Sequence, residues 1–237
     1  PNMGDGGCGT GAALYLSTKG GVLPTITSAY FGPDYSDDQI EAALKAENLE
    51  YTKPENYAAE VASLIHNGNV VARFSGRMEY GPRALGNRSI MYHAREPEVN
   101  QWLNTRLGRT EFMPFAPVTL YEKREECYIN MLGAEHTAEF MTITFDCTDK
   151  MKADCPAAVH VDGTARPQLV RREVNQGYYD ILNEYYKLSG IPSLINTSFN
   201  MHEEPIVCSP EDGVRAFLEG KLDYLAIGSF LVQHPQY

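Results

Sequence analysis

The sequence predicts a mixed domain of helices and strands, of the α/β or α+β class. Helical spacing of apolar residues recurs between short segments typical of strands along most of the chain. The composition supports a folded domain, because 43% of the 237 residues are hydrophobic. The length fits one large domain, or one domain with a piece of another.

The helices are predicted from their caps, their ends and their apolar spacing. A short helix over 11–16 follows a glycine-rich segment. Ser36-x-x-Gln39 is a capping box, and apolar residues follow it at helical spacing. Ser209-Pro210-Glu211-Asp212 combines a cap, an N1 proline and first-turn acids, which predicts a helix that ends at Gly220. Further helices are expected over about 55–67, from Pro97 onward and over 176–188.

The strands are predicted from short apolar runs and from alternation. Met141, Ile143 and Phe145 alternate with polar residues, as in a half-buried strand. The remaining strands are expected at 69–74, 118–121, 157–161, 191–195 and 224–232. Residues 75–89 are rich in glycine and arginine and predict a loop, and 17–35 is the expected connector.

Charge and composition exclude several classes of protein. The chain has 20 Lys and Arg against 31 Asp and Glu, a net charge of −11, which argues against a non-specific nucleic-acid binder. An anionic small ligand would therefore need a local arginine cluster. The longest apolar run, 224–232, is shorter than the roughly 18 residues of a membrane helix, so we expect no membrane span. Five cysteines without a CxxC motif argue against a disulfide framework, and we expect a cytoplasmic setting.

Two arginine-containing segments are candidates for ligand binding. The segment 76–89 places Arg77, Arg83 and Arg88 among glycines and a proline. Guanidinium groups on such a loop can hold phosphate or carboxylate oxygens, although a solvated loop with ion pairs is the alternative. Arg109 heads the second segment, 109–117, whose apolar part is expected to be packed and extended. A surface arginine is the alternative there.

A third candidate is made of two segments that each follow a predicted strand. They are 160–166, which holds His160 and Arg166, and the polar run 196–200. Small polar residues after buried strands often line a ligand crevice, where they could hold a ribose, a phosphate or a planar amide. Ordinary turn chemistry is the alternative.

The run GRMEYGPRALGNRSI at 76–90 resembles the signature of the carbamoyltransferase family that includes NodU and TobZ. RTEFMPFAP, HVDGTARPQ and NTSFNMHEEPIV agree with the same family in the same order. Proteins of this family resemble two fused modules: an actin-like-fold transferase domain with a metal-binding histidine pair, and a YrdC-like domain that makes carbamoyl-adenylate from carbamoyl phosphate and ATP. The resemblance implies that 36–237 is the YrdC-like domain, a mixed twisted sheet flanked by helices. Residues 1–35 would be a remnant of the actin-like-fold domain and a linker.

The resemblance also implies roles for individual residues. Arg83, Arg109 and Arg166 are expected to be catalytic, through contacts with phosphate oxygens. Further contacts with ATP or carbamoyl phosphate are expected from Arg77, Arg88, His160, Asn196, Thr197, Ser198 and Asn200.

Metals and partners are implied in the same way. Glu79 and Glu204 are expected to orient arginines or to hold Mg²⁺. Asp5 would match a metal ligand of the transferase domain, where Fe or another divalent metal is expected. The implied partners are ATP, carbamoyl phosphate and the chain's own transferase domain, which would carbamoylate a hydroxyl of a small molecule; a homodimer is left open.

Two other functions are compatible with the same fold. The chain could be a YrdC-like nucleotide or RNA binder, which the net charge of −11 disfavours. It could also be a non-catalytic fragment that only docks on its transferase half. Binding of ATP and carbamoyl phosphate would argue against the second alternative.

Overall fold

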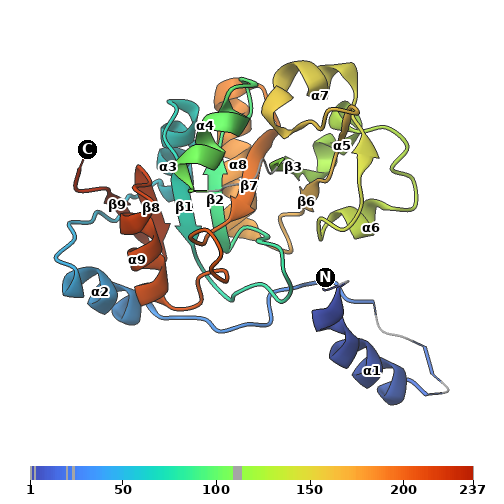
Figure 1. Cartoon of the computed structure of the whole chain (residues 1–237), viewed down its shortest axis with the longest axis horizontal. Helices are drawn as coiled ribbons and strands as arrows, with labels where there is room; N and C mark the ends of the chain where they lie inside the picture. Colours follow the sequence, from blue (N-terminus) through green and yellow to red (C-terminus); the bar gives the residue numbers. More distant parts are fainter. Residues whose placement is uncertain (1, 3, 20, 23–24, 109–113, 237) are drawn as a thin grey trace.

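The architecture is taken from a computed structural model, which describes residues 2, 4–19, 21–22, 25–108 and 114–236. Its centre is a seven-stranded sheet in the order β6-β3-β7-β2-β1-β8-β9 (Figure 1). The β1–β8 and β3–β6 pairs are parallel, and the other neighbours are antiparallel. The strands are β1 (Val71–Phe74), β2 (Arg88–Tyr92), β3 (Ala116–Leu120), β6 (Gln168–Val170), β7 (Ser193–Ser198), β8 (Tyr224–Ile227) and β9 (Phe230–Gln233).

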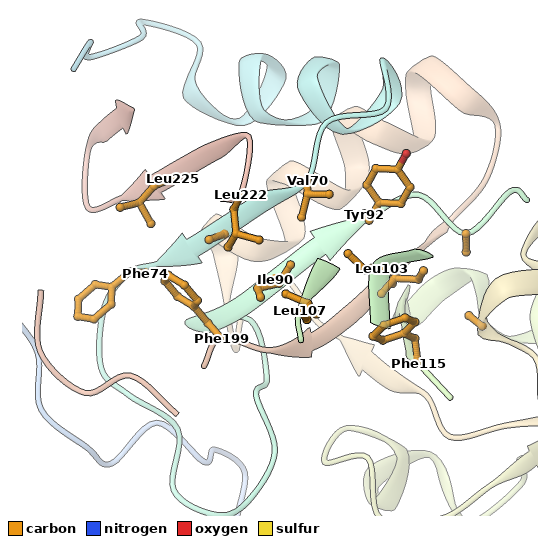
Figure 2. Packing of buried hydrophobic residues seen from close by; sticks show 14 of the residues in the cluster. Val70, Phe74, Ile90, Tyr92, Leu103, Leu107, Phe115, Phe199, Leu222 and Leu225 are labelled. Atoms are coloured by element: carbon orange, nitrogen blue, oxygen red, sulfur yellow. The ribbon is translucent and has the colours of Figure 1, made fainter. Parts of the chain in front are cut away.

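Helices cover both faces of this sheet. On one face lie α3 (Tyr57–His66) and α8 (Gln176–Ser189), which share a buried apolar cluster with Met91 and Leu194. On the other face, α2 (Asp37–Ala46), α4 (Val99–Arg106) and α9 (Pro210–Glu219) contribute to a second, larger cluster. Figure 2 shows Phe74, Ile90 and Phe199 within that cluster. The sheet is thus the middle layer of three, as the predicted class requires.

An insertion of small elements connects β3 to β6. A two-stranded antiparallel sheet, β4 with β5, lies inside it. Buried residues of this insertion, including Cys147 and Met151, belong to the larger apolar cluster. The elements are η2 (Tyr121–Lys123), α5 (Arg124–Cys127), α6 (Glu135–Ala138), β4 (Phe145–Asp146), α7 (Asp149–Asp154), η3 (Pro156–Ala158) and β5 (Thr164–Ala165).

The N-terminal segment stands apart from these layers. It comprises η1 (Asp5–Gly7) and α1 (Cys8–Ser17), and α1 projects away from the rest of the fold (Figure 1). α1 has no buried residue among those described. A long extended segment over 25–35 leads from it to α2.

Most of the predicted helices are confirmed. Both capping boxes are present: the Ser36 hydroxyl accepts from the Gln39 amide, and the Ser209 hydroxyl accepts from the Asp212 amide. α8 ends at Gly190, which adopts the left-handed conformation. These local signals succeeded because caps and stops depend on neighbours in sequence rather than on tertiary contacts.

Several strand predictions are wrong. Residues 157–161 form no strand, because Pro156 begins a 3₁₀ turn there. The expected strand over 141–146 is reduced to its last two residues, since Met141 has a left-handed φ of 54°. The expected strand 224–232 is a hairpin, in which Gly228 at φ 55° forms the turn between β8 and β9. The predicted loop over 75–89 ends early, because β2 begins at Arg88.

No helix in the described ranges is long and apolar enough to cross a bilayer.

Candidate functional site

A pocket of about 80 Å³ lies where the β1–β2 loop meets the C-terminal end of β7. Arg83 comes from that loop, and Arg166 comes from the turn between β5 and β6. The pocket thereby unites the arginine loop, the 160–166 segment and the end of β7, three parts of the chain that the sequence analysis selected separately. Its other lining residues are Pro82, Ala84, Pro114, Ala116, Met141, Asn196, Thr197 and Ser198.

The two arginines in this pocket repel each other. Burial lowers the pKa of Arg166, and the positive charge of Arg83 lowers it further. Within the described ranges, neither guanidinium has a hydrogen bond or an ion pair to an acid, and the buried Nε of Arg166 has no partner. Two adjacent cations without a counter-ion among the described residues create a local positive potential, which a bound anion would neutralise.

Asn196 forms a polar part of the pocket wall. It is buried, and its Nδ2 donates to the carbonyl oxygen of Ala84 at 3.0 Å and to Gln168 Oε1 at 2.7 Å. These bonds fix the orientation of the amide and leave its Oδ1 buried without a partner in the described part of the chain. An unpaired buried acceptor is costly, so Oδ1 is available for an N–H donor on a ligand.

Arg88 is placed differently from Arg83. It is fully buried, its guanidinium lies 3.6 Å from the centre of the Phe74 ring, and burial lowers its pKa to about 10. Its Nη1 donates to the carbonyl oxygens of Ser75, Gly76 and Asn87 at 2.9–3.2 Å. Arg88 therefore stabilises the loop and does not line the pocket. Its expected contact with a ligand stays a prediction.

Arg77 is not among the described residues that line the pocket. Arg77 donates from Nη2 to the carbonyl oxygen of Phe31 at 2.9 Å. Arg109 lies outside the described residues, so its expected role stays a prediction as well.

His160 borders a second hollow, which shares Pro114 with the arginine pocket. The Thr164 hydroxyl donates to Asp162 at 2.8 Å and therefore accepts from His160 Nδ1 at 3.0 Å. This places a proton on Nδ1. His160 is thus oriented by a neighbouring chain of hydrogen bonds.

Asn200 and Glu204 stabilise the turn after β7. Asn200 Nδ2 donates to the carbonyl oxygens of Met201 and Glu204 at 2.7 and 3.0 Å. The Glu204 carboxylate binds Arg215 through two contacts of 2.8 and 3.1 Å. Glu204 thus pairs with an arginine of α9, and its expected role toward the ligand or Mg²⁺ stays a prediction.

The described carboxylates offer no metal cage. No group of three or more histidine, cysteine or acidic side chains suited to a metal ion exists within the described ranges. One oxygen of Glu79 accepts three backbone N–H groups, and Glu204 is bound to Arg215. Mg²⁺ bound to a nucleotide takes most of its ligands from phosphates and water, so its expected presence does not require such a cage.

Sequence reasoning missed the polar residues that lie beneath the arginine loop. Arg73, Gln168 and Asn175 reach the loop from β1, β6 and the start of α8. Gln168 lies at the end of the HVDGTARPQ segment, and its place in that segment was the only feature of the sequence that could have indicated a functional role. No feature of the sequence indicated Arg73 or Asn175, because both contact Asn87, which lies 14 and 88 residues away from them along the chain.

Comparison with known families and proteins agrees with this description. The family model "Carbamoyltransferase C-terminus" matches residues 62–234. The nodulation protein NolNO of Sinorhizobium fredii is 37% identical over 98% of this chain and 35% of its own length. Nodulation protein NolO of Bradyrhizobium diazoefficiens is 36% identical over 98% of this chain and 44% of its own length. The chain therefore spans less than half of these curated relatives.

Solved structures share the fold. Full-length HypF in its phosphate- and nucleotide-bound form aligns with a TM-score of 0.51 and 18% identity, over 76% of this chain and 22% of that chain. Sua5 of P. abyssi, complexed with L-threonine, aligns with a TM-score of 0.50 and 13% identity, over 77% and 49%. These likenesses confirm the expected YrdC-like mixed sheet flanked by helices.

Proposed function

Because this chain belongs to the carbamoyltransferase family through its C-terminal domain, we propose that it forms carbamoyl-adenylate from carbamoyl phosphate and ATP. One observation carries the proposal: Arg83 and Arg166 face one pocket without an acidic partner among the described residues. Such a pocket suits a ligand with several phosphate oxygens. The HypF structure is described as phosphate- and nucleotide-bound, which is consistent with this ligand class.

The chemistry of the reaction requires groups of this kind. Water first cleaves carbamoyl phosphate into carbamate and inorganic phosphate. A carbamate oxygen then bonds to the α-phosphorus of ATP, and pyrophosphate leaves with the electrons of the broken P–O bond. Both substrates and the leaving group are anions, so charge on phosphate oxygens dominates the transition state. We assign Arg83 and Arg166 to these oxygens, together with Arg109, which the resemblance adds. Asn196 Oδ1 is suited to accept from the carbamoyl NH₂ group.

We infer that 1–35 is the end of the preceding transferase domain and a linker. α1 carries the apolar run Ala12-Ala13-Leu14-Tyr15-Leu16, yet Tyr15 and Leu16 are 71% and 68% exposed. A helix that is apolar on all sides is normally buried in a larger protein. The longer relatives have additional chain that could cover it. Transfer to the acceptor hydroxyl, and the metal to which Asp5 would belong, are assigned to that additional domain.

Release of pyrophosphate tests the proposal. The full-length protein and this chain are incubated with ATP and Mg²⁺, with and without carbamoyl phosphate, as wild type and as Arg83→Ala and Arg166→Ala. Arg172→Ala is the matched control, because Arg172 is exposed and paired with Asp180 at 3.4 Å. Losing one charge-assisted contact of about 1.5–3 kcal/mol should weaken ATP binding or turnover by roughly 10- to 150-fold in each pocket variant.

Three results would contradict the proposal. The first is an absence of ATP binding by the full-length protein. The second is pyrophosphate release that does not depend on carbamoyl phosphate. The third is equal activity in Arg83→Ala, Arg166→Ala and Arg172→Ala, which would remove the pocket from the reaction. RNA binding with a steep salt dependence would instead favour a YrdC-like RNA binder.

A further inference from the structure

The end of the loop that carries Arg83, residues 84–88, is held at most of its backbone polar groups by side chains. We propose that Glu79 is the positioning residue of this loop: its carboxylate fixes the backbone of 85–88 and thereby aims Arg83 into the pocket. The inference rests on the proposed function for the identity of the ligand, but it stands on contacts that the proposed function does not use.

The N–H groups of the loop converge on Glu79. Its Oε1 accepts from the backbone amides of Leu85 and Asn87, each at 2.7 Å, and of Arg88 at 3.1 Å. Glu79 is only 5% exposed, so these three bonds form away from bulk water. Bonds from N–H groups to a buried carboxylate are about twice as strong as neutral ones. A single side chain therefore satisfies three of the four consecutive amides over 85–88.

The carbonyl groups of the same loop are bound from other elements. Arg73, buried in β1, donates from Nη1 to the carbonyl oxygen of Gly86. The carbonyl oxygen of Leu85 accepts from the Tyr30 hydroxyl at 2.8 Å and from Gln168 Nε2 at 2.7 Å. The peptide group between Gly86 and Asn87 thus has a guanidinium on its carbonyl and a carboxylate on its amide.

This clamp is continuous with the pocket. Asn196, which lines the pocket and has a buried Oδ1 without a partner among the described residues, donates to the carbonyl oxygen of Ala84, the residue that follows Arg83. Asn196 also binds Gln168, which holds the next carbonyl. A change in the loop backbone would therefore move the Arg83 side chain and the Asn196 acceptor together.

The negative charge of Glu79 has a second effect. Arg73 is buried, and burial lowers its pKa while the charge of Glu79 raises it. Glutamine at position 79 would preserve the size of the side chain and one acceptor oxygen, but it would remove the charge. The variant Glu79→Gln therefore tests the charge-assisted clamp rather than the space that the side chain fills.

The test compares loop rigidity with ligand affinity. Hydrogen exchange of the Leu85, Asn87 and Arg88 amides is measured in the full-length protein, together with the Kd for MgATP by calorimetry. The variants are Glu79→Gln and Glu79→Asp, which keeps the charge on a shorter side chain. Asp223→Asn is the control, because Asp223 also accepts a backbone N–H, from Val70 at 2.7 Å, and binds Arg106, but it lies away from the loop.

A positioning role predicts a specific pattern. Glu79→Gln should speed exchange of the three amides and weaken MgATP binding by about tenfold or more, since each bond loses its charge assistance. Asp223→Asn should lower the thermal midpoint and leave the Kd unchanged. If Glu79→Gln lowers the thermal midpoint but has the same Kd for MgATP as Asp223→Asn, Glu79 has only a structural role and the inference is overturned.

Two further outcomes are separable. If Glu79→Gln does not fold, the Kd of Glu79→Asp tests the inference instead. The shorter side chain of this variant retracts the carboxylate, so the loop must either shift with it or lose its three amide hydrogen bonds. An unchanged Kd for MgATP in Glu79→Asp overturns the inference. If the wild-type protein binds no MgATP, the proposed function fails, and unchanged amide exchange in the variants then overturns the clamp on its own.

Discussion

Replacing Gly86 by alanine should destabilise the protein far more than a typical glycine substitution. Gly86 has a φ of 113°, a backbone conformation that side chains rarely adopt. A Cβ at this position would lie 2.2 Å from Cδ1 and 2.6 Å from Cγ of the Tyr178 ring. Tyr178 is fully buried in α8, so the ring has no space into which it can move. The substitution therefore forces either the loop or the helix to shift.

The magnitude follows from two separate costs. The unfavourable φ costs about 1–3 kcal/mol, and overpacking against a fixed ring costs a further 1–3 kcal/mol. Gly190→Ala is the matched control, because Gly190 ends the same helix at φ 72° but has nothing within 4 Å of an added Cβ. Only the conformational cost, roughly 1–2 kcal/mol, applies there. Gly86→Ala should therefore be the more destabilising change by at least about 1 kcal/mol.

Urea unfolding of both variants measures this difference. The midpoint concentration should fall further for Gly86→Ala, at an unchanged m-value. Binding of MgATP should weaken in Gly86→Ala alone, because the shifted loop carries Arg83. Equal destabilisation by the two variants would refute the close packing of this loop on α8, and with it the rigid loop on which the site depends.

Two other properties can be tested without the ligand. Burial, with the charges of Arg95 and His66, lowers the pKa of His93 to about 4, so the folded state resists a proton that the unfolded state accepts near pH 6.5. The free energy of unfolding should therefore fall by up to about 3 kcal/mol as the pH decreases from 7 to 4; His93→Gln should flatten this profile, and exposed His136→Gln should not. Burial also raises the pKa of the Cys127 and Cys147 thiols to about 12 and about 11, whereas Cys8 and Cys208 are exposed. Mass spectrometry after brief alkylation should find label on Cys8 and Cys208 alone in the native protein; rapid labelling of Cys127 would contradict the described core.

The sequence was most informative where structure is local. The Ser36 and Ser209 caps predicted two helices almost to the residue, because each cap bonds within its own first turn. It failed at 157–161, where a 3₁₀ turn that begins at Pro156 replaces the expected strand, and at β2, where pairing with β1 and β7 decides the outcome. β2 is fully buried and begins with Arg88. Because this first residue is charged, the sequence pattern predicted a polar loop where a central strand begins.

The candidate site could be predicted only in part for a related reason. Motif resemblance identified Arg83, Arg166 and Asn196, and the structure brings these three into one pocket. The resemblance gave no indication that Arg88 is buried at the start of β2 and does not line the pocket. The difference arises from strand alternation: once β2 begins at position 88, that side chain must point toward Phe74 and the larger apolar cluster.

The acidic composition of the chain makes the two pocket arginines unusual. With 31 acidic residues against 20 Lys and Arg, an arginine on this surface would ordinarily find a carboxylate, as Arg106, Arg171 and Arg215 do. Arg83 and Arg166 have none among the described residues; burial lowers the pKa of Arg166, and the charge of Arg83 lowers it further. Keeping two cations together costs stability in the unliganded protein. Neutralising either one, for example by Arg166→Met, should therefore raise the thermal midpoint while it weakens anion binding, a combination expected of a binding site and not of a structural arginine.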